Sequence, residues 1–251
     1  MLDRANRRRD ERMQLIYMVN EVRKDHPTIG CRDLYYMIQP EFIGRDSFEL
    51  FCKDSGLLSR KHRNLRRTTD SSGVKRFDNL TENVVADRLN KIWTSDITYY
   101  ELNNRFYYIT FILDACSRRI VGHSVSKKLS TEETTLPSLK MGIKARGYMD
   151  LSGLILHSDG GGQYYDKEFI KLTSKNGIRN SMCVYPWENG KAERINGVIK
   201  NNYLKHRRIE NFEDLKREVD HAVQMYNYKK PHIKLKRKSP ISYEEKMLLL
   251  H

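Results

Sequence analysis

Three acidic residues, Asp96, Asp159 and Glu193, occupy positions where a charged side chain needs an explanation. Asp96 lies inside an alternating segment rich in β-formers, KIWTSDITYY, and Asp159 follows the apolar run GLILH. Glu193 lies in a segment of helical character, ENGKAERINGVIK. A carboxylate in or at the end of a buried strand is costly unless it is paired or binds a cation. Acids that converge raise one another's pKa, and a divalent metal ion relieves both penalties.

A set of oxygen ligands favours Mg²⁺ or Mn²⁺ over zinc. We expect two such ions per active site, about 4 Å apart, clamping a phosphodiester. One ion would activate the attacking water or 3′-hydroxyl, and the other would stabilise the leaving oxygen. Asp96, Asp159 and Glu193 would fix the ions and need no protonation role of their own.

Three glycines, Gly160, Gly161 and Gly162, follow Asp159 in the stretch HSDGGGQYY. We hypothesise that the missing side chains let a DNA backbone approach the metal ions, with Gln163 lining the DNA. An ordinary glycine turn at the end of a strand is the alternative, and for this stretch in isolation it is the favoured one.

The elements that must position these acids follow from periodicity. The alternating segments 91–101, 104–114 and 117–128 predict three antiparallel strands joined by short turns. Asp114 is expected to cap the second of these turns. Further along, the pattern predicts helices over 130–148, 166–178, 188–205 and 211–227, and strands over 153–157 and 179–184. This order predicts an α/β fold: a ribonuclease-H-like mixed five-stranded sheet flanked by helices.

The chain divides into four regions by pattern and charge. Residues 1–57 form a helical, helix-turn-helix-like DNA-binding region, for which a plain three-helix bundle fits the periodicity equally well. Residues 58–84 are a basic linker, 85–228 the catalytic core, and 229–251 a basic C-terminal tail.

The formal net charge of +14, from 46 Lys and Arg against 32 Asp and Glu, suggests a polyanionic partner. Double-stranded DNA is the first candidate, and a merely soluble basic protein is the alternative. The four cysteines are far apart and read as reduced thiols, and neither a membrane span nor a signal peptide is evident. We therefore expect a cytoplasmic protein that acts on the nucleoid. Phosphate-contact candidates are Arg60, Lys61, Arg63, Arg66, Arg67, Arg118, Arg119, Lys234, Lys236, Arg237 and Lys238.

Taken together, several motifs resemble the DDE catalytic core of retroviral integrases and insertion-sequence transposases, and more narrowly the OrfB product of the IS-three family. They are DITYY, HSDGGGQYY and ENGKAERINGVIK around the three acids, with ILDACSRRIVG, a YN…KPH pattern and Ser239-Pro240 near the end. The resemblance covers nearly the whole chain. Asp159 and Glu193 are 34 positions apart, slightly closer than is usual in the family.

The resemblance implies that Asp96, Asp159 and Glu193 are the catalytic and metal-binding residues. Glu188 is an alternative third acid, because this chain has Glu188-Asn189-Gly190 where the family usually has Asp-Asn-Ala. Helix register favours Glu193, which shares a face with Asn196 and Lys200. Lys200 matches a basic residue that the family is expected to use on transposon-end DNA.

The resemblance also implies the reaction. The protein would cleave insertion-sequence ends and join the freed 3′-hydroxyl to another phosphodiester by two-metal-ion transesterification. Its partners would be transposon-end and target DNA, further copies of the chain on that DNA, and an upstream OrfA-type partner or fusion. Two alternatives stay open: a ribonuclease-H-like nuclease that does not join strands, and a non-catalytic DNA-binding regulator.

Overall fold

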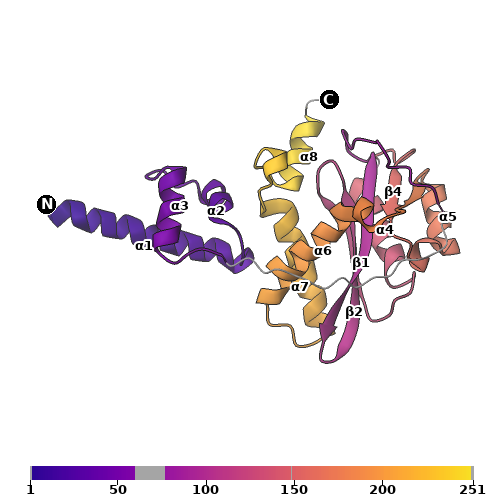
Figure 1. Cartoon of the computed structure of the whole chain (residues 1–251), viewed down its shortest axis with the longest axis horizontal. Coiled ribbons are helices and arrows are strands. Elements are labelled where there is room, and N and C mark those ends of the chain that lie inside the picture. The colour runs from indigo at the N-terminus through magenta and orange to yellow at the C-terminus, as the bar shows by residue number, and fades with distance from the viewer. Residues whose placement is uncertain (1, 60–76, 148, 250–251) are drawn as a thin grey trace.

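The computed structural model describes residues 2–59, 77–147 and 149–249. Within them, a helical domain of residues 2–59 lies beside an α/β core (Figure 1). The helices are α1 (Leu2–Asp25), α2 (Cys31–Ile38), α3 (Arg45–Asp54), α4 (Thr135–Arg146), α5 (Lys167–Lys175), α6 (Gly190–Asn202), α7 (Phe212–Gln224) and α8 (Pro240–Leu248). The strands are β1 (Ile92–Leu102), β2 (Arg105–Asp114), β3 (Ile120–Ser126), β4 (Ile155–Ser158) and β5 (Arg179–Met182).

The five strands form one mixed sheet in the order β3-β2-β1-β4-β5. β1, β2 and β3 are antiparallel neighbours, whereas β4 runs parallel to both β1 and β5. The two short strands β4 and β5 are reached through helices, as parallel pairing requires. This arrangement confirms the predicted ribonuclease-H-like fold.

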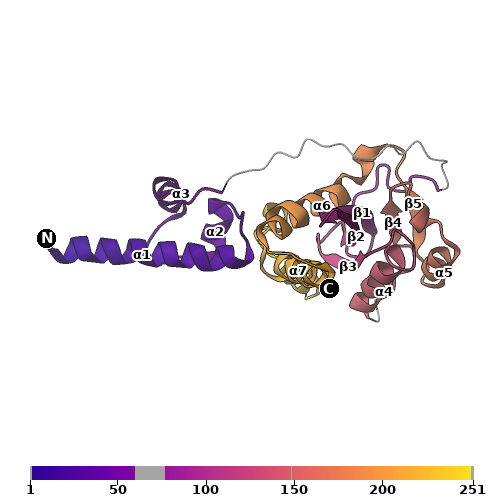
Figure 2. The ribbon, with the colours of Figure 1, turned by 90° about the horizontal axis from the view of Figure 1, so that it is seen from below.

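Helices cover both faces of the sheet (Figure 2). On one face, Ile109 and Phe111 of β2 pack with Ile199 of α6 and Leu215 of α7. On the other face, Trp93 of β1 packs beneath α4 and α5 in a second apolar cluster. Both clusters are needed because alternate residues of a central strand point to opposite faces.

The helical domain has its own core, in which Leu15, Val19, Leu34 and Phe48 are fully or almost fully buried. Helix α1 runs toward the core, and His26, directly after its last residue, contacts Tyr203 at the end of α6. The prediction of three helices is confirmed, while DNA binding by this domain remains a prediction.

Two boundaries differ from the sequence prediction. Leu80 and Val84, which were expected in the basic linker, pack against Ile92 and Ile155 at the start of β1 and β4. Residues 240–248, expected within a basic tail, form α8 and bury Glu244. Residues 229–251 carry many charges, so the few positions of α8 that pack against the core are not evident from the sequence pattern. The linker cations Arg60, Lys61, Arg63, Arg66 and Arg67 lie outside the described residues.

Candidate active site

Asp96 and Asp159 lie side by side on the neighbouring strands β1 and β4. The parallel register pairs Thr94 with His157, so two residues further on Asp96 faces Asp159 just beyond the end of β4. β4 ends here while β1 continues to Leu102, so the two acids lie at the carboxyl end of β4, the position where open α/β sheets bind ligands. The predicted convergence of these two acids is therefore present in the fold.

Both carboxylates sit where their charge is disfavoured. Burial, together with the neighbouring carboxylates of Asp159 and Glu193, raises the pKa of Asp96 to about 8, against the hydrogen bonds that the carboxyl accepts. Burial also raises the pKa of Asp159, which the backbone N–H of Gly161 partly offsets. Within the described residues neither acid has a cationic partner. The arrangement suits an added cation, because only a positive charge would make two ionised carboxylates stable here.

Glu193 lies on the side of α6 that faces β1, as the helix register predicts. Three and seven residues further along this helix, Asn196 and Lys200 both contact β1. Asn196 donates to Asp96 Oδ2 at 2.7 Å, and Lys200 donates to the Tyr99 carbonyl at 2.7 Å. The Glu193 side chain itself is exposed.

The three acids do not form a closed metal cage. Among residues 2–59, 77–147 and 149–249, no three His, Cys, Asp or Glu side chains are grouped closely enough to hold a metal ion together. Asp96 and Asp159 thus supply a preformed pair, and Glu193 stands near it on a surface helix. The chemistry of the donors fits Mg²⁺ or Mn²⁺, since all are oxygens.

Glu188, the alternative third acid, is already engaged. Its carboxylate accepts the backbone N–H groups of Val184 at 2.6 Å and Tyr185 at 3.0 Å. Burial would raise its pKa, but these hydrogen bonds leave it below its usual value. The geometry gives Glu188 the role of holding the loop before α6, so Glu193 is the better candidate.

The three glycines after Asp159 have different surroundings. A Cβ on Gly160 would come within 2.9 Å of Met182 Cε, and one on Gly161 within 3.1 Å of Asp159 Oδ1. Only Gly162 has open space, with nothing within 4 Å of an added Cβ. Two of the glycines therefore lie against movable side-chain ends of the protein itself, and Gly162 is the one of the three that is open to a closely approaching DNA backbone.

Several predicted DNA contacts are used inside the molecule. Lys200 bonds to β1 and also lies over the ring of Tyr99. Gln163 donates to the Leu129 carbonyl at 3.3 Å. Arg237 forms an ion pair with Asp33 of the helical domain. The exposed Lys236 and partly buried Lys238 lie in the turn around it, and their contact with DNA stays a prediction.

Sequence reasoning missed three polar side chains that shape the site. Asn196 holds Asp96, Asn189 donates to the Ser95 carbonyl at 2.9 Å, and the Tyr164 hydroxyl shares a 2.9 Å hydrogen bond with Ser95. The position of Asn196, three residues after Glu193 on the same helix face, was the available signal. His157 is a buried structural histidine, bonded to Ser181 through Nδ1.

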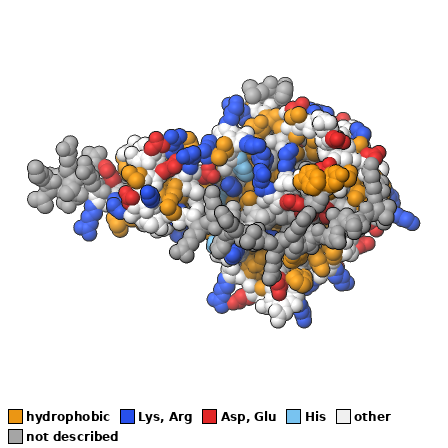
Figure 3. Space-filling model, in the orientation of Figure 1, with side chains coloured by type: hydrophobic (Ala, Val, Ile, Leu, Met, Phe, Trp, Pro, Cys, Tyr) orange, Lys and Arg blue, Asp and Glu red, His pale blue; other side chains and the backbone are white. Residues whose placement is uncertain are grey.

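A cationic cluster flanks α6. Lys191 lies in the first turn of this helix. Burial, together with the like charges of Arg118 and Lys234, lowers the pKa of Lys191. Figure 3 shows Lys and Arg side chains gathered on the part of the core that lies beside the helical domain. Such a grouping of like charges favours a polyanion as partner.

Comparison with known families agrees with this geometry. Two models, each described as an integrase core domain, match residues 86–185 and residues 178–240.

None of the helices in the described part of the chain has the length and apolarity needed to cross a bilayer.

Similar proteins come from insertion elements. A 31 kDa protein of insertion element IS600 from Shigella sonnei is 28% identical over 247 residues, covering 94% of this chain and 88% of the relative. A protein assigned as the transposase of IS986/IS6110 from Mycobacterium tuberculosis is 29% identical over 70% of this chain, which spans only 66% of that relative. The HTLV-2 integrase catalytic core, solved with magnesium, aligns with a TM-score of 0.48 and 22% identity over 61% of this chain and 95% of that one.

Proposed function

We propose that this chain, an insertion-sequence transposase with an integrase-type core, cleaves a phosphodiester at each end of its element and joins the freed 3′-hydroxyl to a second phosphodiester. The observation that carries the proposal is that Asp96 lies next to Asp159 at the carboxyl end of β4, with Glu193 nearby on α6. Two partly buried acids without a cationic partner in the described residues would attract an external cation, and a scissile phosphate bound to that cation would lie at the carboxyl end of β4.

Asp96, Asp159 and Glu193 would hold the cations, which we take to be two Mg²⁺ or Mn²⁺ ions. When bound, these ions supply an activated oxygen nucleophile and stabilise the leaving oxygen. The residues of the chain provide position. Asn196 and the backbone N–H of Ile97 fix the two oxygens of Asp96, and Gly161 fixes one oxygen of Asp159. The exposed Glu193 would turn toward the pair when cations bind.

DNA would approach over α6 and the loop that precedes it. Lys191 lies in the first turn of this helix and is repelled by the like charges of Arg118 and Lys234, so a phosphate backbone here would relieve that repulsion. Oligomers on DNA, and an upstream OrfA-type partner that contributes to end recognition, belong to the same proposal.

The test is incubation of the protein with Mg²⁺ and a labelled duplex that carries the element's end, with cut and joined products scored separately. A transposase produces both, whereas a nuclease cuts the end but never joins it to a second duplex. Asp159→Asn should keep DNA affinity and lose both products. If the wild type binds the duplex but yields neither product, the protein is a non-catalytic DNA-binding regulator.

A further inference from the structure

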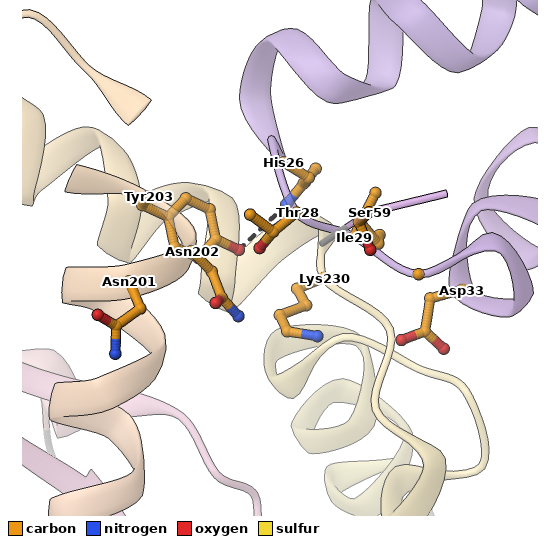
Figure 4. A pocket seen from close by; sticks show the side chains of 10 residues that line it. His26, Thr28, Ile29, Asp33, Ser59, Asn201, Asn202, Tyr203 and Lys230 are labelled. Carbon is orange, nitrogen blue, oxygen red and sulfur yellow. Dashed lines mark hydrogen bonds between the residues drawn. The ribbon is translucent and has the colours of Figure 1, made fainter. Parts of the chain in front are cut away.

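A cavity of about 420 Å³ lies where the helical domain meets the core (Figure 4). His26, Thr28 and Gly30 line it from the helical domain, and Asn202 lines it from the end of α6. Lys230, from the segment after α7, reaches in between these two walls. We call it the seam cavity, and it is separate from the pair of acids described above.

Donor groups in the seam cavity lack partners within the described residues. His26 is only 4% exposed; its Nδ1 shares a 3.0 Å hydrogen bond with the Tyr203 hydroxyl, while Nε2 has no partner. The buried Thr28 Oγ1 has none either. The Lys230 ammonium makes no hydrogen bond or ion pair there, and burial lowers the pKa of Lys230. The two atoms of His26 and Thr28 have almost no accessible surface, so within the described residues the partnerless donor that faces the cavity is the Lys230 ammonium.

The backbone adds a further positive feature. Helix α2 has eight residues and begins at Cys31, and its N-cap residue Gly30 offers no side chain to cap the first N–H groups. An uncapped helix N-terminus carries a partial positive charge and binds anions. Here it opens beside the Lys230 ammonium, so two independent positive features face one cavity.

One acid also lines the seam cavity, and its charge is already neutralised. Asp33 forms an ion pair with Arg237, whose guanidinium also lies over the ring of Tyr36. The charge left uncompensated is therefore that of Lys230. His26 is neutral near pH 7, because burial lowers its pKa to about 4. When Nδ1 accepts the Tyr203 hydrogen, Nε2 carries a hydrogen and is a donor.

We propose that the seam cavity binds a phosphate group of the DNA backbone, held jointly by the N-terminus of α2 and by Lys230. This inference rests on the proposed function, which supplies the DNA. The Lys230 ammonium and the N–H groups at the start of α2 are donors, which match the acceptor oxygens of a phosphate. The cavity is larger than one phosphate and leaves room for the flanking sugars, which favours a phosphodiester over free phosphate. A phosphate held by both walls would fix the helical domain against the core while DNA is bound.

The first test compares Lys230→Gln with Lys229→Gln, its exposed neighbour. Duplex affinity is measured over a range of salt concentrations. Lys230→Gln should weaken binding about tenfold at low salt and reduce the slope of log K against log salt by about 0.9, the value for one lost phosphate contact. Lys229→Gln should change affinity less than about twofold. Equal effects of the two substitutions would overturn the proposal.

The second test uses Gly30, where φ is −72° and an added Cβ would meet nothing within 4 Å. Gly30→Asp and Gly30→Asn both cap α2 and should leave the melting temperature equal or higher. Both caps occupy N–H groups that the phosphate would use, and only the aspartate also places a negative charge at the cavity, so Gly30→Asn should weaken DNA binding and Gly30→Asp should weaken it more, by about tenfold. If both variants bind DNA like the wild type, the seam is purely structural.

A third arm separates the two sources of phosphate. If inorganic phosphate at millimolar concentration raises the melting temperature of the wild type but not of Lys230→Gln, while the two proteins bind DNA alike, the cavity holds free phosphate and the assignment to DNA fails. Cleavage and joining by the wild type are scored in parallel. Their absence counts against the proposed function, whereas the affinity of these variants decides the cavity.

Discussion

The side-chain amide of Asn196 donates a 2.7 Å hydrogen bond to Oδ2 of Asp96, which ties helix α6 directly to the central strand of the sheet. The other oxygen of Asp96 accepts the backbone N–H of Ile97. Both oxygens of the first acid are therefore oriented before any cation arrives. Glu193 lies one turn before Asn196 on the same helix, so this hydrogen bond also sets how far Glu193 lies from Asp96.

Asn196→Ala should weaken catalysis by disturbing this orientation. We expect cleavage to fall about 10- to 100-fold at low Mg²⁺, the range found when groups that orient metal ligands are removed. A higher Mg²⁺ concentration should restore part of the rate, because a positioning residue acts through metal affinity. The measurement is cleavage of the labelled duplex as a function of Mg²⁺. Gln224→Ala, at an exposed site on α7, is the control and should leave the curve unchanged.

Asp96 should make the metal-free protein less stable as the pH rises toward 8. Its folded pKa of about 8 exceeds the ordinary aspartate pKa of 3.8, so between these values the folded state binds more protons than the unfolded state. This contribution to stability is present below pH 3.8 and is lost as the pH rises, by up to about 1.4 kcal/mol per pH unit.

The buried histidines change the folding stability in the opposite direction and over a different pH range. Burial lowers the pKa of His26 and His157 to about 4 and that of His232 to about 3, so their stabilisation is complete above pH 6.5. Unfolding in urea between pH 6.5 and 8, with a chelator present, therefore isolates Asp96 from these histidines. The wild type should lose stability across this window and Asp96→Asn should lose less, while Mg²⁺ should flatten the wild-type curve. Parallel curves for the two proteins would contradict the burial of this charge.

The pairing of Asp96 and Asp159 could be predicted from the sequence, because each acid interrupts or ends an apolar strand and such strands neighbour one another in a mixed sheet. The bond between Asn196 and Asp96 could not, since it depends on how α6 crosses β1. The bonds of Glu188 depend in the same way on the path of a loop. Helix α8 was missed because only Pro240 and Glu244 of its residues are buried, which leaves no apolar periodicity to read.

Substitution of the two glutamates near the start of α6 should show which is the third acid. Glu193→Gln should reduce cleavage about 10²- to 10³-fold, the range lost when one group that stabilises the transition state is removed. Glu188→Gln keeps one carbonyl oxygen to accept the N–H groups of Val184 and Tyr185, so it should cost less than about tenfold. Single-turnover cleavage at saturating DNA measures both. A Glu188→Gln enzyme as inactive as Glu193→Gln would transfer the catalytic role to Glu188.

The C-terminal helix should prove to be part of the core's stability rather than a dispensable tail. Glu244 of α8 is 3% exposed and forms a 2.8 Å ion pair with Arg146, which also pairs with Asp114 at 3.0 Å. Burial alone would raise the pKa of Glu244, but Arg146 holds it below its usual value, so the glutamate is charged at neutral pH. Glu244→Gln leaves part of the Arg146 charge buried and uncompensated, and should cost about 3 kcal/mol. Glu245→Gln, at the exposed neighbouring position, should stay within about 0.5 kcal/mol of the wild type. Urea unfolding with unchanged m-values measures both, and equal midpoints for the two variants would show that α8 contributes nothing to the fold.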